Sequence, residues 1–341
     1  GEATFDIGEM AQTFIDRRLL NRTWGREPGV LGPRTSTFNL PLEVRPAAAG
    51  LPPVEAGDLL NSLLAGSADT GGFLTAAGST ATSINLAVGG GAAYTIGRLV
   101  RINGEIRGIT NIVGDVLTVS PALSAAPAAT VAVTPARTYR PKETGFGSFT
   151  VEQFLGGALR RTIIGWTPGL KIEGITADAL ARLSFSGPAD SHFTSDVTIQ
   201  WSPSFDLTRP RPSRASRVYL GGTSVVAVEA SLDALMPADA KPAVTGADGR
   251  DGNVYANRDT KGMLKVWTED GAHVHRFERG AIMELFVQIG PFAFWCPRIQ
   301  HNAMPIAADA GKYQHALPFN VLSATAAGVS DFALGFFAES A

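Results

Sequence analysis

The chain has 341 residues, of which 45% are hydrophobic and 18% charged, with a formal net charge of −2. This length is enough for a substantial core in one large or two smaller domains. The near-neutral charge disfavours a general nucleic-acid binder, because such proteins carry a basic surplus that grips phosphates.

Cys296 is the single cysteine, so an intramolecular disulfide is excluded and a reducing compartment is compatible with the sequence. No run of about 18 uncharged apolar residues is present, so we expect no membrane span. The first residues carry no basic region followed by an apolar run, so we expect no signal peptide. The sequence therefore predicts a soluble protein made in the cytosol.

Residues 1–34 are predicted to form an N-terminal arm, with a short helix at 9–16. Chain ends that are rich in glycine and proline are often loosely attached. The alternative is an arm that becomes ordered against a neighbouring subunit. The arm is basic and contains Arg17, Arg18, Arg22 and Arg26.

Residues 36–45 alternate apolar and polar side chains, which predicts a strand. Pro41 cannot donate to a sheet ladder and therefore favours an edge position. A short helix is predicted over 52–66, with Gly66 as its C-terminal stop. Its apolar stripe consists of Leu59, Leu60, Leu63 and Leu64.

Residues 75–140 are dominated by Ala, Thr, Val and Gly and have few acidic residues. Short β-type runs alternate with turn signals here, and Asn103-Gly104 is the strongest hairpin signal. We interpret this stretch as a small all-β domain inserted into a main domain. The main domain then consists of residues 35–74 and 141–341, and the strands of the insert are expected at 83–88, 99–102, 106–113, 116–119 and 130–134.

The stretch 169–187 contains two alternating runs separated by a short polar turn. This pattern predicts an antiparallel hairpin with one buried face and one wet, charged face. A second copy of the pattern lies at 283–290. We expect both in one sheet whose wet face is the working surface, carrying Lys171, Glu173, Arg182, Ser184, Glu284 and Gln288.

The rest of the main domain is also predicted to be β-rich, because Gly and Pro are plentiful and helix-period stretches are few. Residues 236–259 are rich in Asp, Gly and Pro and are predicted to be a long loop that includes Asp248, Arg250 and Asp251. Strands are expected at 148–154, 219–231, 263–267, 272–277, 283–289, 296–300 and 319–324.

No catalytic or cofactor-binding apparatus is predicted, and we do not expect an enzyme. His273 and His275 lie two residues apart on one face of a predicted strand, as metal ligands could, but no carboxylate or cysteine accompanies them at metal-ligand spacing. The run from Asp248 to Asn253 resembles part of a calcium loop without its bidentate Glu. Cys296 has no neighbouring base, which disfavours covalent catalysis. We therefore expect no metal and no cofactor.

The order of these features resembles the major tail tube proteins of long-tailed (siphovirus-type) bacteriophages. The resemblance covers roughly residues 35–66 and 141–326 at the level of pattern. It rests on the alternating strand before Pro52-Pro53 and the leucine helix, on 165–174 and 181–187, and on 283–290 followed by 296–299 and 317–319.

That family implies an antiparallel β-sandwich or partial barrel with a flanking helix, here with the insert on the tube exterior. It also implies homohexameric rings stacked head to tail around a DNA-ejection channel, in a virion tail assembled in the host cytoplasm. The six wet-face residues then line the lumen, and the arm arginines with Asp248, Arg250 and Asp251 form inter-ring contacts. The expected partners are the tape measure, terminator and distal tail proteins, with double-stranded DNA in passage and no membrane.

Two other functions remain open. One is another tail ring, such as a terminator. The other is a carbohydrate-binding β-sandwich module that uses Trp267 and Trp295 as its aromatic platform.

Overall fold

A computed structural model describes residues 6–7, 11–15, 30–45, 54–155, 159–196, 213, 216–234, 238–242, 250–255, 258–267, 272–309, 312–324 and 328–337. These residues form a mainly β, antiparallel fold, as the sequence predicts. Within them, α-helix is confined to α1 (Val54–Leu63) and α2 (Ala272–Glu278).

One sheet of 16 strands organises the main domain. Its main path runs through β1 (Asp6–Ile7), β3 (Val30–Glu43), β14 (Arg182–Ala189), β13 (Gly169–Thr176), β18 (Ala227–Asp233), β21 (Lys261–Trp267), β25 (Lys312–Val321), β23 (Phe292–His301), β22 (Ile282–Ile289), β16 (Arg217–Leu220) and β17 (Thr223–Val225). Branches add β2 (Ala11–Ile15) on β3, β24 (Ile306–Asp309) on β25, β26 (Ala333–Phe336) on β23, β10 (Arg137–Pro141) on β26, and β4 (Leu64–Ala68) on β10.

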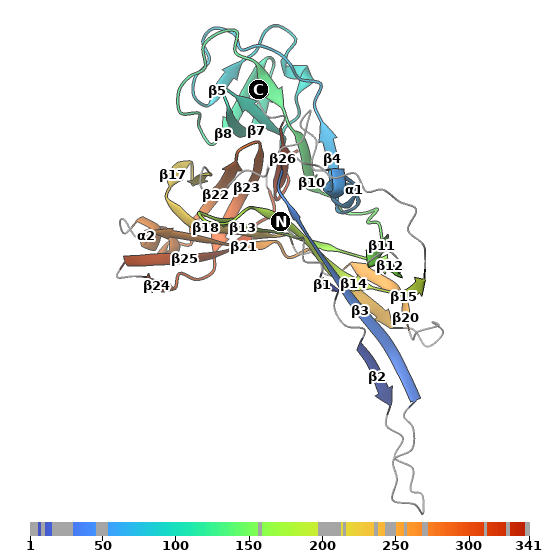
Figure 1. The fold of residues 1–341 in the computed structure, drawn as a ribbon. Helices are drawn as coiled ribbons and strands as arrows, with labels where there is room; N and C mark the ends of the chain where they lie inside the picture. Colours follow the sequence, from blue (N-terminus) through green and yellow to red (C-terminus); the bar gives the residue numbers. More distant parts are fainter. Residues whose placement is uncertain are drawn as a thin grey trace, which may run out of the picture.

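The sheet folds over itself into two layers that enclose an apolar core. In Figure 1, β13, β18, β21 and β25 lie across the steeper β22, β23 and β26. Buried side chains from both layers belong to the same cluster, including Ile172 and Leu264 from one layer and Val287 and Phe294 from the other. Burial of such residues is the main source of stability. Among the described strands, the path ends at β1 and β17 and does not close into a barrel.

The predicted central hairpin is confirmed as β13 paired with β14, from Gly169 opposite Ser186 to Glu173 opposite Arg182. The strand at 283–290 is confirmed as β22 of the same sheet. Most other predicted strands of the main domain are also present, as β11 (Phe149–Leu155), the pair β16 and β17 leading into β18, and β21, β23 and β25.

Several boundaries near the N-terminus differ from the prediction. Residues 11–15 form β2 against β3 instead of helix, since β-branched and aromatic residues suit a strand that finds a partner. Helix α1 ends at Leu63, and Gly66 lies in β4 opposite Tyr139. A Cβ on Gly66 would lie 2.6 Å from the Tyr139 ring, so this glycine permits close packing and does not stop the helix.

Two further predictions are wrong. The stretch 236–259 is not simply a loop, because β19 (Ala238–Pro242) pairs with β20 (Arg250–Tyr255). Residues 272–277 lie in α2, where Val274 and Phe277 are half-buried at helical i,i+3 spacing. Another small sheet contains β11, β12 (Leu159–Trp166) and β15 (Ser191–Asp196).

The predicted insert contains a separate five-stranded sheet with a core of its own. Asn103 and Gly104 both have positive φ, 51° and 77°, as a two-residue hairpin turn requires. We call residues 75–136 the insert, because the predicted last residues, 137–140, belong to β10 of the main sheet. Its sheet has the order β5 (Ser83–Asn85), β8 (Val116–Ser120), β7 (Glu105–Val113), β6 (Leu99–Ile102) and β9 (Val133–Pro135), and η2 (Gly91–Ala93) precedes β6.

The chain leaves the main domain before the five-stranded sheet and returns to it afterwards at the same place. Strands β4 and β10, on either side of it in sequence, pair with each other, and the insert stands above them at the top of Figure 1. Its base packs on the main domain through a cluster that joins Leu99 and Ile106 to Phe286 and Trp295. Gly108 lies against the Trp295 indole, where an added Cβ would come within 2.5 Å of a ring carbon.

We expect Gly108→Ala to destabilise the protein by about 1–3 kcal/mol, because the buried Trp295 indole cannot move away from the new methyl group without strain. The free energy of unfolding in urea measures this effect. Gly147→Ala is the control, since its Cβ would meet only the Ser62 Cβ at 3.4 Å. Equal stability of both variants would contradict close packing between the insert and the main domain.

Candidate functional site: the charged sheet face

One face of the main sheet carries rows of charged side chains that run across successive strands. In the first row, Glu43, Arg182 and Glu173 lie side by side on β3, β14 and β13. In the second row, Lys171 on β13 lies opposite Asp233 on β18, which in turn lies opposite a lysine of β21. The sign of the charge alternates from strand to strand in both rows, so cross-strand neighbours attract each other.

A third pair, Glu229 and Lys265, lies opposite each other across β18 and β21. Strand geometry explains the arrangement, because successive side chains point to opposite faces. Ile172, Leu232 and Leu264 alternate with the charges along β13, β18 and β21, and their side chains are fully buried in the core. The same alternation that builds the core therefore builds the charged rows.

The charges on this face balance one another. We call the face formed by β3, β14, β13, β18 and β21 the charged face. Opposite charges there are in direct contact, with Lys171 Nζ 2.8 Å from Glu173 Oε2, and Lys265 paired with Glu229. The cations on these strands, Lys171, Arg182, Lys261 and Lys265, equal in number the carboxylates, Glu43, Glu173, Glu229 and Asp233.

These ion pairs remain in contact with water, since about half of the Lys171 side chain and a third of the Glu173 side chain are exposed, 48% and 36%. The hydrogen bond to Glu173 raises the pKa of Lys171, and the nearby Asp233 and Glu229 act in the same direction. Exposed pairs of this kind contribute roughly 0–1 kcal/mol each. Their main effect is therefore on the surface potential and less on stability.

Three of the predicted wet-face residues meet on the charged face, as expected: Lys171, Glu173 and Arg182. Ser184 lies opposite Lys171 on the same face, but only 8% of it is exposed. Its hydroxyl donates a hydrogen bond to Asn39 Oδ1 at 3.1 Å. Ser184 therefore contributes little to the exposed surface.

Glu284 and Gln288 do not belong to the charged face, and the prediction that they share it is wrong. Both lie on β22, and the insert covers them. Glu284 accepts hydrogen bonds from Ser120 Oγ at 2.6 Å and from Trp295 Nε1 at 2.5 Å. Gln288, 7% exposed, accepts one from the Ile106 amide at 3.1 Å. The alternation on β22 is real, but a segment distant in sequence buries its polar side.

A buried arginine completes the contact between the insert and the main domain. Arg107 on β7 is fully buried and forms an ion pair with Glu105. Its guanidinium also donates to the Tyr219 hydroxyl at 3.2 Å and lies over the Tyr219 ring, 4.8 Å from the centroid. Buried charges are costly unless they are paired and hydrogen-bonded. This network therefore fixes how the insert sits on β16 and β22.

Most of the residues predicted for inter-ring contacts lie outside the described part of the chain. These are Arg17, Arg18, Arg22, Arg26 and Asp248. Arg250 begins β20. Asp251 on β20 is exposed and pairs with Lys241 Nζ at 2.6 Å, and this hydrogen bond lowers the pKa of the Asp251 carboxyl.

Sequence reasoning missed five charged residues of the charged face. They are Glu43, Glu229, Asp233, Lys261 and Lys265. The signal was present, because Glu229 and Asp233 alternate with buried residues along β18, as the two lysines do along β21. The valines of 219–231 predict a strand without showing where its charges lie. Only the register between β13, β18 and β21 brings the charges of these strands together.

The residues singled out for chemistry do not assemble into a reactive site among the described residues. His273 and His275 lie on α2, so the prediction that they share one face of a strand is wrong. In the calcium-like run, residues 250–253 belong to β20, and the Asp251 carboxylate is engaged by Lys241. Burial raises the pKa of the Cys296 thiol, which disfavours the reactive thiolate.

Within the described chain, no group of three or more His, Cys, Asp or Glu side chains is placed to hold a metal ion. No helix in that part of the chain is both long and apolar enough to cross a membrane.

Comparison with known proteins adds no functional assignment. No protein-family model matches the chain, and no curated protein matches it in sequence.

We expect Glu284→Gln to stabilise the protein at pH 8 and to have little effect at pH 4. Burial raises the pKa of Glu284 above its ordinary value, although Ser120, Trp295 and Arg107 oppose the shift. The folded chain then binds this proton more tightly than the unfolded chain, so stability falls as the pH rises through the raised pKa. A glutamine has no charge, and it can accept from Trp295 and donate to the Ser120 hydroxyl.

Urea unfolding of both proteins between pH 4 and pH 8 measures this difference. Glu152→Gln is the matched control, because Glu152 forms an exposed pair with Arg160 at 3.3 Å. Its effect should stay below about 1 kcal/mol at every pH. A stability gap between Glu284→Gln and the native chain that does not widen with pH would contradict the assigned burial of Glu284.

Proposed function

We propose that this chain is the building block of a bacteriophage tail tube. Copies of it form homohexameric rings, and the rings stack around a channel for double-stranded DNA. The observation that carries the proposal is the charged face, where alternating charges cross β3, β14, β13, β18 and β21. In the assembled tube this face lines the lumen, with Lys171, Glu173 and Arg182 as lining residues.

A charge-balanced face is suited to a surface along which DNA moves. Proteins that hold DNA place unpaired lysines and arginines on phosphates and release counterions. On the charged face, Lys171 and Lys265 are each paired with a carboxylate of the same face. A phosphate that approached either lysine would compete with a carboxylate already bound there. The lumen would therefore be hydrated and polar but would not bind the DNA tightly.

The open edges of the main sheet support self-association. Residues 40–43 of β3 pair with β14, while β1 reaches only Phe38 and Asn39, so Pro41 lies at an edge of the described sheet. Strand β24, at the other side of this layer, pairs among the described strands with β25 alone. Exposed edges offer unpaired amide and carbonyl groups to another chain, and closure into a barrel removes them.

The projecting parts of the chain fit a subunit of a larger assembly. Strands β2 and β3 extend from the body as a two-stranded ribbon, and the insert projects in a different direction (Figure 1). An isolated pair of strands is marginally stable in water. In the proposed tube the ribbon contacts a neighbouring ring, and the insert faces the exterior. The tape measure, terminator and distal tail proteins would be the other partners.

The carbohydrate-binding alternative needs Trp267 and Trp295 as an exposed aromatic platform, and only one of them reaches the surface. Trp295 is 1% exposed and packs against the insert at Gly108, so it cannot stack on a sugar ring. Trp267 lies on β21 and is partly buried.

Negative-stain electron microscopy of the purified full chain tests the proposal. We expect rings of six copies and stacks of rings that enclose a hollow axis. Single rings that never stack at high concentration would favour a terminator-like ring. A monomer at every concentration and ionic strength would exclude the proposal, because its sheet edges would then need no partner.

A second prediction concerns the charge balance of the lumen. Replacing three carboxylates, as Glu173→Gln, Glu229→Gln and Asp233→Asn, removes the ion-pair partners of Lys171 and Lys265 and the carboxylate that lies opposite Lys261. We expect this variant to retain double-stranded DNA at low salt, whereas the native protein does not. The logarithm of its binding constant should fall with the logarithm of salt concentration, with a slope of up to roughly −1.8 for the two lysines that lose their ion-pair partners.

The mirror variant, Lys171→Gln, Lys261→Gln and Lys265→Gln, is the matched control and should not bind DNA. Fluorescence anisotropy of a labelled duplex measures binding in all three proteins. DNA binding by the native protein as strong as that of the variant with three carboxylates replaced would argue against a lumen on this face.

A further inference from the structure

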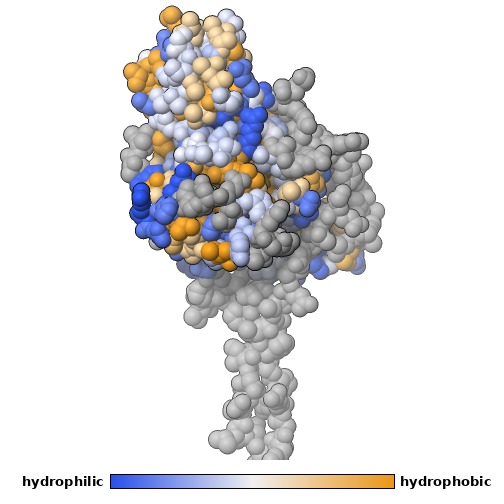
Figure 2. Space-filling model, turned by 90° about the vertical axis from the view of Figure 1, so that its left-hand side faces the viewer, coloured by the Kyte–Doolittle hydropathy of each residue, from blue (hydrophilic) through white to orange (hydrophobic). Residues whose placement is uncertain are grey.

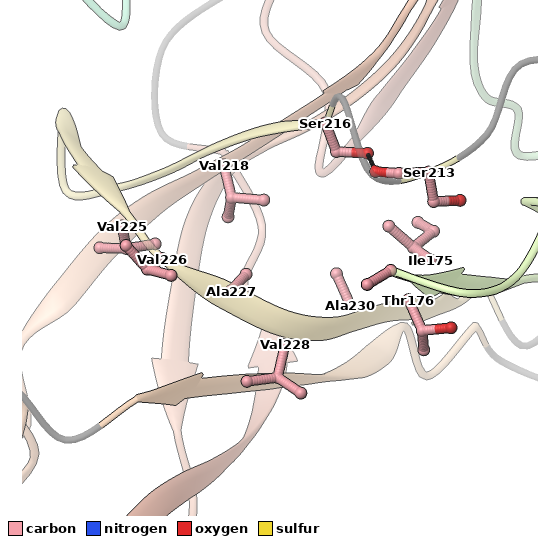
Figure 3. A pocket seen from close by; sticks show the side chains of 11 residues that line it. Ile175, Thr176, Ser213, Ser216, Val218, Val225, Val226, Ala227, Val228 and Ala230 are labelled. Carbon is pink, nitrogen blue, oxygen red and sulfur yellow. Dashed lines mark hydrogen bonds between the residues drawn. The ribbon is translucent and has the colours of Figure 1, made fainter.

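A cleft lined mainly by valine and alanine, with Thr176, Ser213 and Ser216 as its polar residues, opens on one flank of the main domain. The cleft has a volume of about 320 Å³ and lies between β16, β18 and the end of β13. Val218 points down from β16 toward Ala227 and Ala230, which point up from β18 (Figure 3). No charged side chain is among the described residues that line it. We call it the valine cleft.

The rim of the valine cleft exposes apolar surface to water. Val226, which joins β17 to β18, is 58% exposed, and Val225 is half-buried beside it. Figure 2 looks onto this flank and shows hydrophobic residues gathered below the insert. Strand β17 is also the last strand of the sheet path, so its outer edge has no neighbour among the described strands. Apolar surface at an unfinished sheet edge favours association with another chain.

The opposite flank carries exposed apolar side chains that protrude. Phe193 on β15 lies opposite Thr162 on β12, and Ile164 lies two residues further along β12 on the same face. Phe193 is 48% exposed and Ile164 39% exposed. Strand β15 is the last strand of its small sheet and, among the described strands, forms ladder pairs with β12 alone. Figure 1 shows β12 and β15 on the right of the body and β17 on its left.

We propose that the valine cleft of one copy receives the Phe193 surface of the next copy. The occupant is a second copy because this chain itself presents the complementary feature, on the flank that faces away from the cleft. Two valine clefts facing each other would leave two hollows unfilled. Joining unlike flanks is a heterologous, head-to-tail contact, which closes into a ring or extends a stack.

The proposed contact rests on the proposed tube. It specifies the surfaces through which the subunits of the tube join. It places the edge of β17 and the edge of β15 at the same junction, so one association covers both edges and both apolar surfaces. An aromatic side chain that fills a desolvated pocket is a typical centre of binding energy at an interface. Phe193 and Val226 are therefore the two residues on which the contact should depend most.

Crosslinking between two different single-cysteine variants tests the contact. Ser224→Cys, on β17 beside Val225, and Ser191→Cys, on β15 two residues from Phe193, keep Val226 and Phe193 intact; they are prepared separately and mixed under conditions that allow assembly. The native Cys296 is fully buried and should not react. A short thiol-reactive bifunctional reagent is used, because a direct disulfide demands Cα atoms roughly 4.4–6.8 Å apart. We expect a covalent dimer from the mixture and none from either variant alone.

Val88→Cys mixed with Ser191→Cys is the matched control. Val88 is 96% exposed and belongs to the insert, which stands above both flanks, so this mixture should give no dimer. Assembly of uncrosslinked variants gives a second measurement. Phe193→Ser should raise the critical concentration for assembly about tenfold or more, whereas Phe193→Tyr should leave it near the native value. Thermal unfolding of each variant verifies that the exposed substitution leaves the fold intact.

The outcomes separate this inference from the proposed tube. Rings or tubes that form without the crosslink would overturn the contact and leave the tube standing. A crosslink in a particle that has no hollow axis would support the contact and exclude the tube. If neither a crosslink nor a hollow particle formed, both the contact and the tube would be excluded. Dimers from a single variant alone would indicate a like-to-like contact and overturn the proposal.

One further result would also overturn it. If native mass spectrometry found a small apolar molecule bound to a stable monomer, and Val226→Asp released that molecule, the valine cleft would be a ligand site instead.

Discussion

The period of two along a β-strand is the constraint on which the whole molecule depends. On β13, Ile172 enters the core while Lys171 and Glu173 stay in water, and the same division recurs on β14, β18 and β21. A register shift of one residue in any of these strands would bury charges and expose the core. The core therefore holds the charged face in place, and the alternating signs across the strands reinforce the same register.

The insert shows how the same alternation can lead to a different result. On β22 the polar side carries Glu284 and Gln288, but the base of the insert covers both and supplies hydrogen-bond partners to each. Arg107 joins this contact with its guanidinium fully buried. The polar side of the sheet is thus divided between one region that stays wet and one that serves as a docking surface within the chain.

The surfaces that remain open have complementary character. The charged face has as many cations as carboxylates, so like copies do not repel one another through it. The valine cleft and the Phe193 surface lie on opposite flanks, and β3 and β24 have ladder positions that no described strand occupies. A chain with balanced charge, open edges and unlike apolar flanks has the physical requirements of a self-assembling subunit, which is why we favour a tube over a monomeric binding module.

Local sequence was sufficient to predict the antiparallel β character, the strands of the insert, the central hairpin and the wet placement of Lys171, Glu173 and Arg182. Each of these depends on periodicity and turn residues, which a single stretch of chain records. Only the assembled sheet shows that Glu229 and Lys265 join the charged face and that Glu284 lies beneath the insert. These outcomes depend on which distant segment covers or pairs with a strand, and local periodicity carries no information about that partner.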